Sequence, residues 1–252
     1  MTIRHLGIMA ALPQELGDVR EQLDQASTVE WAHRSYHSGQ VGALTVTATT
    51  ARVGKVAAAS TATTLVQQFK VDAIVFVGVA GGLGQGVKVG DVVLARELLQ
   101  HDLNAAPLFP VHEIPLLGLK RVPTDIDLTV ALRAATEQAM VGWQAQASHP
   151  ILSGSNLREG LILSGDQFIH QPGHAEQLLM ANPDALAVEM EGAALAQVCW
   201  EHKTRFAVIR TISDRADSDA PMAFDAFLKE VAAPMSNAIL RGLLSLLASR
   251  FR

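Results

Sequence analysis

Short apolar runs alternate with amphipathic segments along nearly the whole of this 252-residue chain. The apolar runs have the length of buried strands and are bounded by turn-forming residues, whereas the segments between them repeat their apolar residues with helical spacing. This alternation predicts an α/β sheet that helices cover on both faces. The expected strands are 6–12, 43–49, 73–79, 91–95, 160–163 and 206–209, and the expected helices are 13–25, 54–69, 125–140, 173–180, 191–202 and 223–249.

The composition suits one domain with a large core. Hydrophobic residues make up 49% of the chain and charged residues 18%, and a chain of about 250 residues is compatible with a single α/β domain. We therefore expect one domain over residues 1–252. The net charge is −5, and no run of Lys and Arg is longer than a pair such as Lys120-Arg121. This pattern excludes the electrostatic footprint of a protein that binds nucleic acid or anionic membrane, so we expect a small-molecule partner.

The cysteine content and the N-terminal sequence indicate in which cellular compartment the protein is expected. Cys199 is the only cysteine, so a disulfide within the chain is impossible, and we interpret it as a buried, unreactive thiol. The first apolar run is broken by Pro13 and Glu15 and has no cleavage-site pattern. No stretch of 18 uninterrupted apolar residues occurs. These features predict a cytoplasmic protein without a membrane-spanning helix.

Charged and polar residues gather where two predicted strands end. Glu189 and Glu191 lie where one apolar run meets a helix, and Arg210, Ser213 and Asp214 follow the next run. Buried carboxylates need a partner or a chemical role. Because ligands bind outside the carboxyl ends of strands in open α/β sheets, we expect these side chains to converge on one crevice.

Two other patterns carry less information. The glycine cluster at 78–86 does not have the G-x-G-x-x-G spacing, and another predicted strand follows it, so it does not indicate dinucleotide binding. It is either a structural turn or a place where backbone approaches a ligand closely. The His33/His37 and His170/His174 pairs share no helical face, so we expect no metal site.

Five segments, 7–15, 79–83, 164–169, 188–191 and 210–214, occur in an order that resembles the 5'-methylthioadenosine/S-adenosylhomocysteine nucleosidases. The resemblance spans most of the chain. It implies the purine nucleoside phosphorylase-like fold, a three-layer αβα arrangement around a central twisted mixed sheet. It also implies hydrolysis of the N-glycosidic bond of 5'-substituted adenosines, without a cofactor, by a homodimer.

The same resemblance implies roles for four catalytic residues. Asp214 would protonate the purine at N7, and Glu191 would hold the ribose hydroxyls. Glu15 would be the general base for the attacking water, although its position alone equally suits a carboxylate at a helix N-terminus. Arg210 would orient the water and the carboxylates. The implied substrate-binding residues are Phe168, Ile169, Met190, Val79, Gly81, Ser213, Met9, Val53 and Phe224.

The sequence departs from the family pattern in one place and leaves two others open. Val79 stands where related nucleosidases often have a serine, so water placement and substrate preference are open. Arg52 precedes a predicted helix, and its turn is either solvated or an anion site. The proline-rich stretch 104–124 is expected to be an ordered loop that forms a pocket wall or a subunit contact.

Two alternatives to the nucleosidase remain. Another enzyme of the same fold, either a nucleoside phosphorylase or a hydrolase of a futalosine derivative, would differ in its need for phosphate or in the base that it releases. A non-catalytic nucleoside-binding protein would keep the pocket without turnover. The set formed by Glu15, Glu191, Arg210 and Asp214 favours an enzyme.

Overall fold

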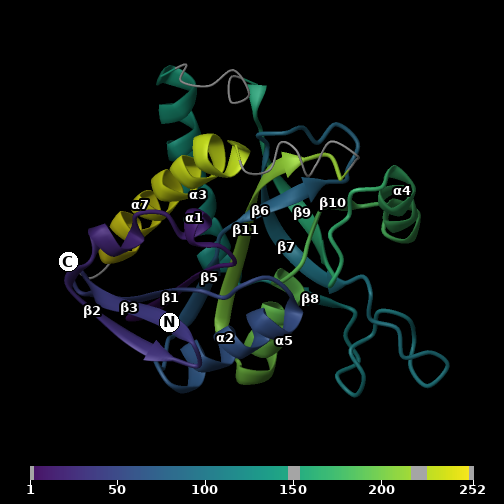
Figure 1. Cartoon of the computed structure of the whole chain (residues 1–252), viewed down its shortest axis with the longest axis horizontal. Coiled ribbons are helices and arrows are strands. Elements are labelled where there is room, and N and C mark those ends of the chain that lie inside the picture. The colour runs from purple at the N-terminus through teal and green to yellow at the C-terminus, as the bar shows by residue number, and fades with distance from the viewer. Residues whose placement is uncertain (1–2, 147–153, 217–225, 250–252) are drawn as a thin grey trace.

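Strands from the whole length of the chain form one mixed sheet in the computed structural model, which describes residues 3–146, 154–216 and 226–249 (Figure 1). The sheet has eleven strands in the order β2-β3-β4-β1-β5-β11-β6-β10-β9-β7-β8. The strands are β1 His5–Ala10, β2 Asp24–Trp31, β3 Arg34–Val41, β4 Leu44–Thr50, β5 Ala73–Phe76, β6 Val79–Gly82, β7 Val92–Gln100, β8 Arg121–Pro123, β9 Leu157–Ser164, β10 Ala185–Glu189 and β11 Arg205–Asp214. The helices are α1 Pro13–Leu16, α2 Lys55–Gln67, α3 Ile126–Gln146, α4 Pro172–Ala181, α5 Gly192–His202 and α7 Ala233–Ser249, with a 3-10 turn at Val19–Gln22 and a π-helical turn at Leu228–Ala232.

Strand β11 joins the two halves of the sheet. It runs parallel to β5 on one side and parallel to β6 on the other, and it also pairs antiparallel with β7. Since β6 pairs with β10, β10 with β9 and β9 with β7, these pairings close a ring of strands in the second half. The ring brings the ends of β10 and β11 and the whole of β6 close together.

Successive side chains of the strands point to opposite faces of the sheet, so a hydrophobic core lies on each face. On β1, Leu6 and Ile8 point to the face that α3 and α7 cover, whereas Met9 points to the face that α2 and α5 cover. Figure 1 shows the two helix pairs on opposite sides of the sheet. The predicted three-layer αβα fold with a mixed central sheet is therefore confirmed.

The N-terminal segment differs from its prediction. The expected helix over 13–25 is wrong beyond its first turn, because α1 ends at Leu16 and Gly17 follows with a φ of 58°. A 3-10 turn comes next, and β2 begins at Asp24. The hairpin of β2 and β3 has no apolar alternation on β2, whose residues are all exposed. Pairing with β3 therefore decides its conformation.

The glycine cluster forms a strand in part. Val79–Gly82 is β6, which lies between β10 and β11. A Cβ on Gly81 would lie 3.0 Å from the Asp214 Oδ1 atom, and one on Gly82 would lie 3.0 Å from Ile212 Cγ2. The glycines thus serve close packing against β11 and its carboxylate.

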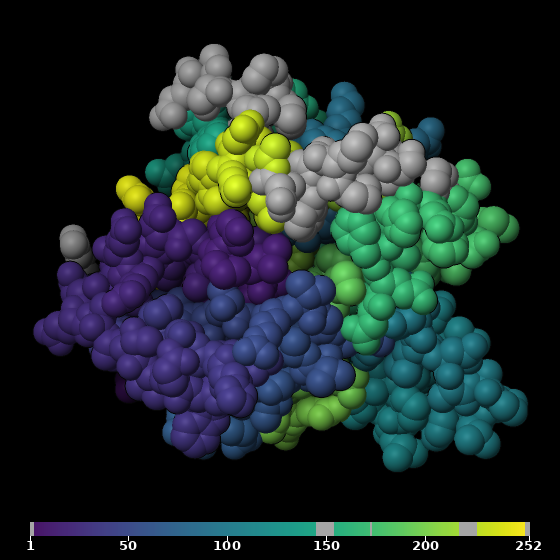
Figure 2. Space-filling model, in the orientation of Figure 1, coloured from purple at the N-terminus to yellow at the C-terminus, as the bar shows by residue number. Residues whose placement is uncertain are grey.

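The loop 104–120 protrudes from the body of the molecule, as the teal segment in Figures 1 and 2 shows. Its only β-bridge among the described residues joins Ile114 and Leu119. Helix α3 begins where expected, and the Asp125 Oδ1 atom accepts a hydrogen bond of 2.8 Å from the Leu128 N–H as an N-cap does.

The C-terminal helical segment Leu228–Ser249 is apolar and long enough to cross a membrane by length and composition. Half of its most apolar window is buried inside the fold. Leu240 and Leu243 are fully buried there, in the core on the α3 side of the sheet. The burial accounts for the apolar composition of this segment.

Candidate active site

A cavity of about 480 Å³ lies beyond the carboxyl ends of β1 and β10 and beside β6 and the end of β11. Its wall includes Val53, in the turn before α2, and Phe168, in the loop between β9 and α4. The convergence predicted for two strand ends is therefore present. The lining residues are Ala11, Leu12, Glu15, Val53, Val79, Ala80, Gly81, Gln167, Phe168, Ile169, Val188, Glu189, Met190, Glu191, Ser213 and Asp214.

Glu189 and Arg210 form a buried ion pair at the base of this cavity. The Arg210 Nη2 atom donates to Glu189 Oε2 at 2.7 Å, and the two side chains are only 2% and 3% exposed. The Glu189 carboxylate also accepts hydrogen bonds from the Ser164 hydroxyl and from the N–H groups of Glu191 and Gly192. Glu189 is thus satisfied on both oxygens by the protein itself.

Arg210 lies behind the cavity wall. Its Nη1 atom donates to the carbonyl oxygens of Phe76 and Ile209 at 3.1 and 3.0 Å, and its guanidinium carbon lies 4.2 Å from the centre of the Phe76 ring. These contacts fix the guanidinium plane. Arg210 therefore contacts Glu189 and does not itself line the cavity.

Glu15 reaches the cavity from the first turn of α1. Its Oε2 atom accepts from the Leu12 N–H at 2.7 Å, and its Oε1 atom accepts from the Val79 N–H at 3.0 Å. Gly78 makes room for this arrangement, because a Cβ there would lie 3.0 Å from Glu15 Oε1. Burial raises the pKa of the Glu15 carboxyl, and the charge of Arg210 opposes that rise. A raised pKa suits a group that accepts a proton near neutral pH.

Glu191 lies just beyond β10, at the start of α5. Its Oε1 atom accepts a hydrogen bond of 2.7 Å from the Gly54 N–H, which precedes α2. Burial, and then the negative charge of Glu189, raise the pKa of Glu191 to about 8. Near neutral pH most of the protein therefore carries a proton on Glu191, and a positive charge beside this carboxyl would favour release of that proton.

Asp214 faces the cavity from the end of β11. Its Oδ2 atom accepts from the Ser213 hydroxyl at 2.7 Å, and its Oδ1 atom accepts from the Ala216 N–H at 2.8 Å. Successive strand residues normally point to opposite faces, yet Ser213 and Asp214 both line the cavity. The register of β11 against β6 shifts between Ile212 and Asp214, and such an irregularity re-aims side chains.

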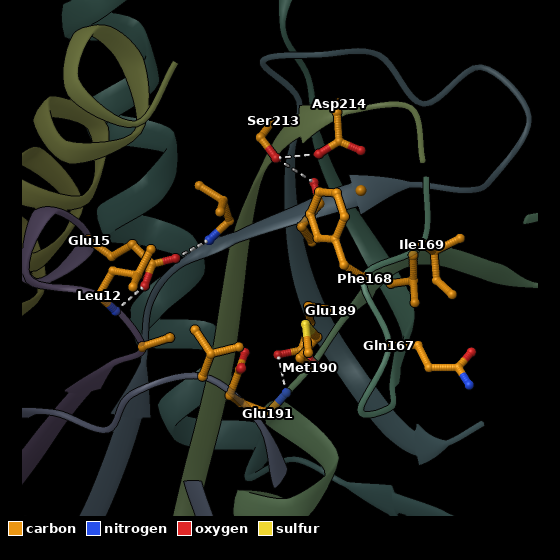
Figure 3. A pocket seen from close by; sticks show the side chains of 16 residues that line it. Leu12, Glu15, Gln167, Phe168, Ile169, Glu189, Met190, Glu191, Ser213 and Asp214 are labelled. Carbon is orange, nitrogen blue, oxygen red and sulfur yellow. Dashed lines mark hydrogen bonds between the residues drawn. The ribbon is translucent and has the colours of Figure 1, made fainter. Parts of the chain in front are cut away.

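The carboxylates surround the cavity from different sides. Figure 3 shows Glu15 on the left, Glu191 at the bottom and Asp214 with Ser213 at the top. The Phe168 side chain is 45% exposed and lies nearly parallel to the His170 ring, with the ring centres 6.2 Å apart. An exposed aromatic face beside a carboxylate is suited to a flat heterocyclic ligand.

Two of the predicted site residues that the structure describes, Met9 and Arg210, do not line the cavity. Met9 was expected in the wall of an apolar pocket, but it is fully buried in the core between the sheet and α2. The alternation along β1 turns Met9 away from the face that its neighbours occupy. Arg210 lies behind Glu189, as described above, and Phe224 lies outside the described residues.

Arg52 is exposed, and its Nη2 atom donates to the His33 carbonyl oxygen at 2.7 Å. This contact agrees with the interpretation of a solvated turn. Cys199 is fully buried, and burial raises the pKa of its thiol. Among the residues that the structure describes, no group of three or more His, Cys, Asp or Glu side chains is arranged to hold a metal ion.

Ser164 is a site residue to which the sequence assigned no role of its own. Its hydroxyl donates to Glu189 and accepts a hydrogen bond of 2.7 Å from the Ala193 N–H. The side chain therefore links the end of β9 to the first turn of α5 and holds Glu189 in place. Its position directly after an apolar run is the sequence signal for this role.

The raised pKa of Glu191 predicts a pH dependence of stability. An unfolded glutamate has an ordinary value of 4.5, whereas the folded protein retains this proton up to about pH 8. The free energy of unfolding should therefore be highest below the ordinary value and fall as the pH rises towards 8. We expect Glu191→Gln to flatten this decline in thermal unfolding midpoints, and Glu176→Gln, on the exposed side of α4, to leave it unchanged. Parallel curves for wild type and Glu191→Gln would contradict the assignment.

Similarity to known proteins extends over nearly the whole chain. The phosphorylase superfamily model matches residues 5–245. A 5'-methylthioadenosine/S-adenosylhomocysteine nucleosidase of Staphylococcus carnosus is 32% identical over 242 residues, which cover 96% of this chain and 100% of the relative. The corresponding protein of Colwellia psychrerythraea is 33% identical over 237 residues, which cover 93% of each chain.

Solved structures give the same result. The nucleosidase of Neisseria meningitidis in complex with methylthio-immucillin-A superposes with a TM-score of 0.86 at 30% identity, over 96% of this chain and 99% of the other. Futalosine hydrolase of Helicobacter pylori superposes with a TM-score of 0.83 at 29% identity, over 96% and 98% of the two chains. The chain belongs to the phosphorylase superfamily and, within it, to the 5'-methylthioadenosine/S-adenosylhomocysteine nucleosidase family.

Proposed function

We propose that this protein is an N-ribosyl hydrolase that cleaves 5'-substituted adenosines, such as 5'-methylthioadenosine and S-adenosylhomocysteine, into adenine and the 5'-substituted ribose. The observation that carries the proposal is the arrangement of Glu15, Glu191 and Asp214 on different sides of one largely apolar cavity. Cleavage of an N-glycosidic bond needs a proton for the leaving base, stabilisation of a cationic sugar and a base for water. The three carboxyl groups supply these functions.

Asp214 acts on the base. As the bond between the ribose C1' atom and the purine N9 atom breaks, its electron pair moves into the base, and a proton from the Asp214 carboxyl reaches N7. The Ser213 hydroxyl, 2.7 Å from Asp214 Oδ2, holds the carboxyl in place. The Phe168 ring covers a face of the purine, and the backbone of Ile169 lies beside its edge.

Glu191 and Glu15 act on the sugar and on water. The Glu191 carboxylate binds the ribose hydroxyls, with Met190 against the sugar, and its negative charge stabilises the developing oxocarbenium ion. Water then attacks C1' and loses a proton to Glu15. The buried carboxyls Glu15, Glu189 and Glu191 face one buried cation, Arg210, and this excess of carboxyl groups favours a cationic transition state.

Water is the proposed nucleophile because the described cavity wall carries no arginine or lysine. Arg210 is engaged by Glu189, and Arg52 contacts the His33 carbonyl. A phosphate ion in the cavity would therefore meet carboxylates without a compensating cation. The second candidate function is hydrolysis of a futalosine-type nucleoside, which the similarity to the Helicobacter pylori futalosine hydrolase supports.

The reaction products distinguish these functions. We expect the purified protein to release adenine and methylthioribose from 5'-methylthioadenosine equally well with and without phosphate, as chromatography of the products would measure. Adenine release that requires phosphate, together with a sugar 1-phosphate, would indicate a phosphorylase. Cleavage of futalosine derivatives alone would support the second candidate.

Loss of the base-protonating group should stop the reaction without unfolding the protein. We expect Asp214→Asn to lower kcat by at least about 100-fold, because general acid catalysis contributes about this much or more. Steady-state kinetics measure the loss, and thermal unfolding confirms the fold. Cys199→Ser is the control, since this buried thiol lies outside the cavity wall and its activity should be nearly that of wild type. Normal turnover by Asp214→Asn would remove this residue from its role.

We further propose that the active form is a cytoplasmic homodimer. The single cysteine is free, which suits a reducing compartment. The protruding loop exposes Leu108 and Leu116 at 83% and 90%, and Val56 on α2, three residues after the cavity residue Val53, is 81% exposed. A contact between subunits would remove these apolar side chains from water. Val53 and Phe168, at the mouth itself, would then be covered by the second subunit.

The subunit proposal predicts the mass in solution. Light scattering should give twice the chain mass of 26.9 kDa. Leu108→Asp combined with Leu116→Asp should give single chains and weaker substrate binding, because charges on the loop oppose burial between subunits. Met180→Asp, on the exposed side of α4, is the control. A wild-type protein that stays monomeric at micromolar concentration would contradict the proposal.

A further inference from the structure

The first turn of α2 is held by carboxylates from two other parts of the chain. The Gly54 N–H donates to Glu191 Oε1 at 2.7 Å, and the Lys55 N–H donates to Asp166 Oδ1 at 2.8 Å. The N-cap residue Gly54 has no side chain that could cap the helix. Two N–H groups at this helix start, which lack partners within the helix, are therefore bound by a cavity carboxyl and by the β9–α4 loop, residues 165–171.

A ring of polar contacts surrounds this helix start. The Lys55 Nζ atom lies 2.6 Å from Asp102 Oδ1 and 3.2 Å from Gln100 Oε1. The Asp102 Oδ2 atom accepts from the Asp166 N–H at 2.9 Å, and Asp166 Oδ1 in turn accepts from the Lys55 N–H. Lys55, Asp102 and Asp166 thus form a closed cycle that links α2, the segment after β7 and the β9–α4 loop.

The Lys55–Asp102 ion pair is partly exposed to solvent, and hydrogen bonds still restrain it. Its side chains are 17% and 23% exposed for Lys55 and Asp102. Partial burial raises the pKa of Asp102, but the hydrogen bonds from Lys55 and from the Asp166 N–H outweigh it, and the pKa is lowered overall. The ionised pair is therefore the stable form in this position.

The ring connects to both sides of the cavity. Gly54, which binds Glu191, directly precedes Lys55, and Phe168 comes two residues after Asp166. Gly54 has a φ of 101°, and a Cβ there would lie 3.2 Å from Asp166 Oδ1, so this turn leaves little space between α2 and the loop. The Gly54 N–H, which donates to Glu191, and the Phe168 ring would therefore move relative to each other if α2 shifted away from the loop.

We propose that Lys55 and Asp102 are positioning residues. Their ion pair holds the start of α2 against the β9–α4 loop and so maintains the hydrogen bond from the Gly54 N–H to Glu191. The inference rests on the proposed function for Glu191 in the reaction. Neither side chain lines the cavity, so the pair acts through Glu191 and through the loop that carries Phe168.

The test removes the positive charge of Lys55 and retains an unbranched apolar side chain. We expect Lys55→Met to lower kcat/KM for 5'-methylthioadenosine by about tenfold, since small misplacements at a site are costly. The acidic limb of the kcat/KM profile should also move to higher pH, because the Gly54 N–H is one of the groups that lower the pKa of Glu191. Lys55→Arg should restore activity to within about threefold of wild type, because its guanidinium pairs with carboxylates.

Lys88→Met is the matched control, because Lys88 is exposed and lies outside the cavity wall. It should keep the wild-type rate and profile. An unchanged pH profile in a folded Lys55→Met protein, or an equal loss in Lys88→Met, would overturn the proposal. If Lys55→Met does not fold, Asp102→Asn replaces it with the same expected direction.

A double variant tests the coupling between the two side chains. Lys55→Met together with Asp102→Asn should be no slower than Lys55→Met alone within about twofold, because residues of one network have non-additive effects. If the losses of kcat/KM in the two single variants multiply in the double variant, the two side chains act independently. That result would overturn the proposal that their ion pair is responsible.

Hydrogen exchange separates this inference from the proposed function. In Lys55→Met, amide exchange measured by mass spectrometry should speed up in peptides that cover 53–56 and 165–170, and it should not do so in Lys88→Met. This readout does not need turnover. A wild-type protein that releases no adenine would refute the proposed function, and unchanged exchange in Lys55→Met would refute the positioning role.

Discussion

Arg210 and Glu189 place opposite charges in a region that water hardly reaches, and the other groups of the cavity are arranged around that pair. Removing one partner of such a pair costs about 3–5 kcal/mol, because the remaining charge stays buried without compensation. Hydrogen bonds to Glu189 from Ser164 and from the backbone of α5 offset part of the separate cost of taking these charges out of water. Arg210 is held in the same way by two carbonyl oxygens and the Phe76 ring. The start of α5 and the middle of β11 are thereby fixed relative to each other.

The charge balance around this pair explains the electrostatics of the cavity. Burial raises the pKa values of Glu15 and Glu191, and the negative charge of Glu189 adds to the rise at Glu191. Carboxyls with raised pKa values favour the protonated form, and a positive charge on a bound ligand favours their ionised form. The same excess of carboxyl groups opposes binding of an anion such as phosphate. Because Glu189 engages Arg210, this cation does not offset that effect, and water is therefore the proposed nucleophile.

Several features of the site followed from the sequence because they depend on local patterns. A carboxylate after a buried apolar run lies at a strand end whatever its neighbours are, so Glu191 and Asp214 were expected at one edge. Met9 was misplaced because the resemblance locates a residue along the strand, whereas the pleat decides its face. The helix predicted over 13–25 was wrong beyond Leu16, because Gly17 has a φ of 58° and the residues from Asp24 onward pair with β3.

The sequence by itself determined the alternation of strands and helices, the αβα layering and the residue types at the strand ends, because side-chain periodicity and turn residues act over a few positions. The tertiary structure decided which of these residues meet. The ion pair of Glu189 with Arg210 and the contact of Gly54 with Glu191 join positions 21 and 137 residues apart. The shift of register that turns both Ser213 and Asp214 to the cavity depends on pairing with β6. Such contacts, and the pKa values that follow from them, depend on burial and on distances in space, which no local pattern contains.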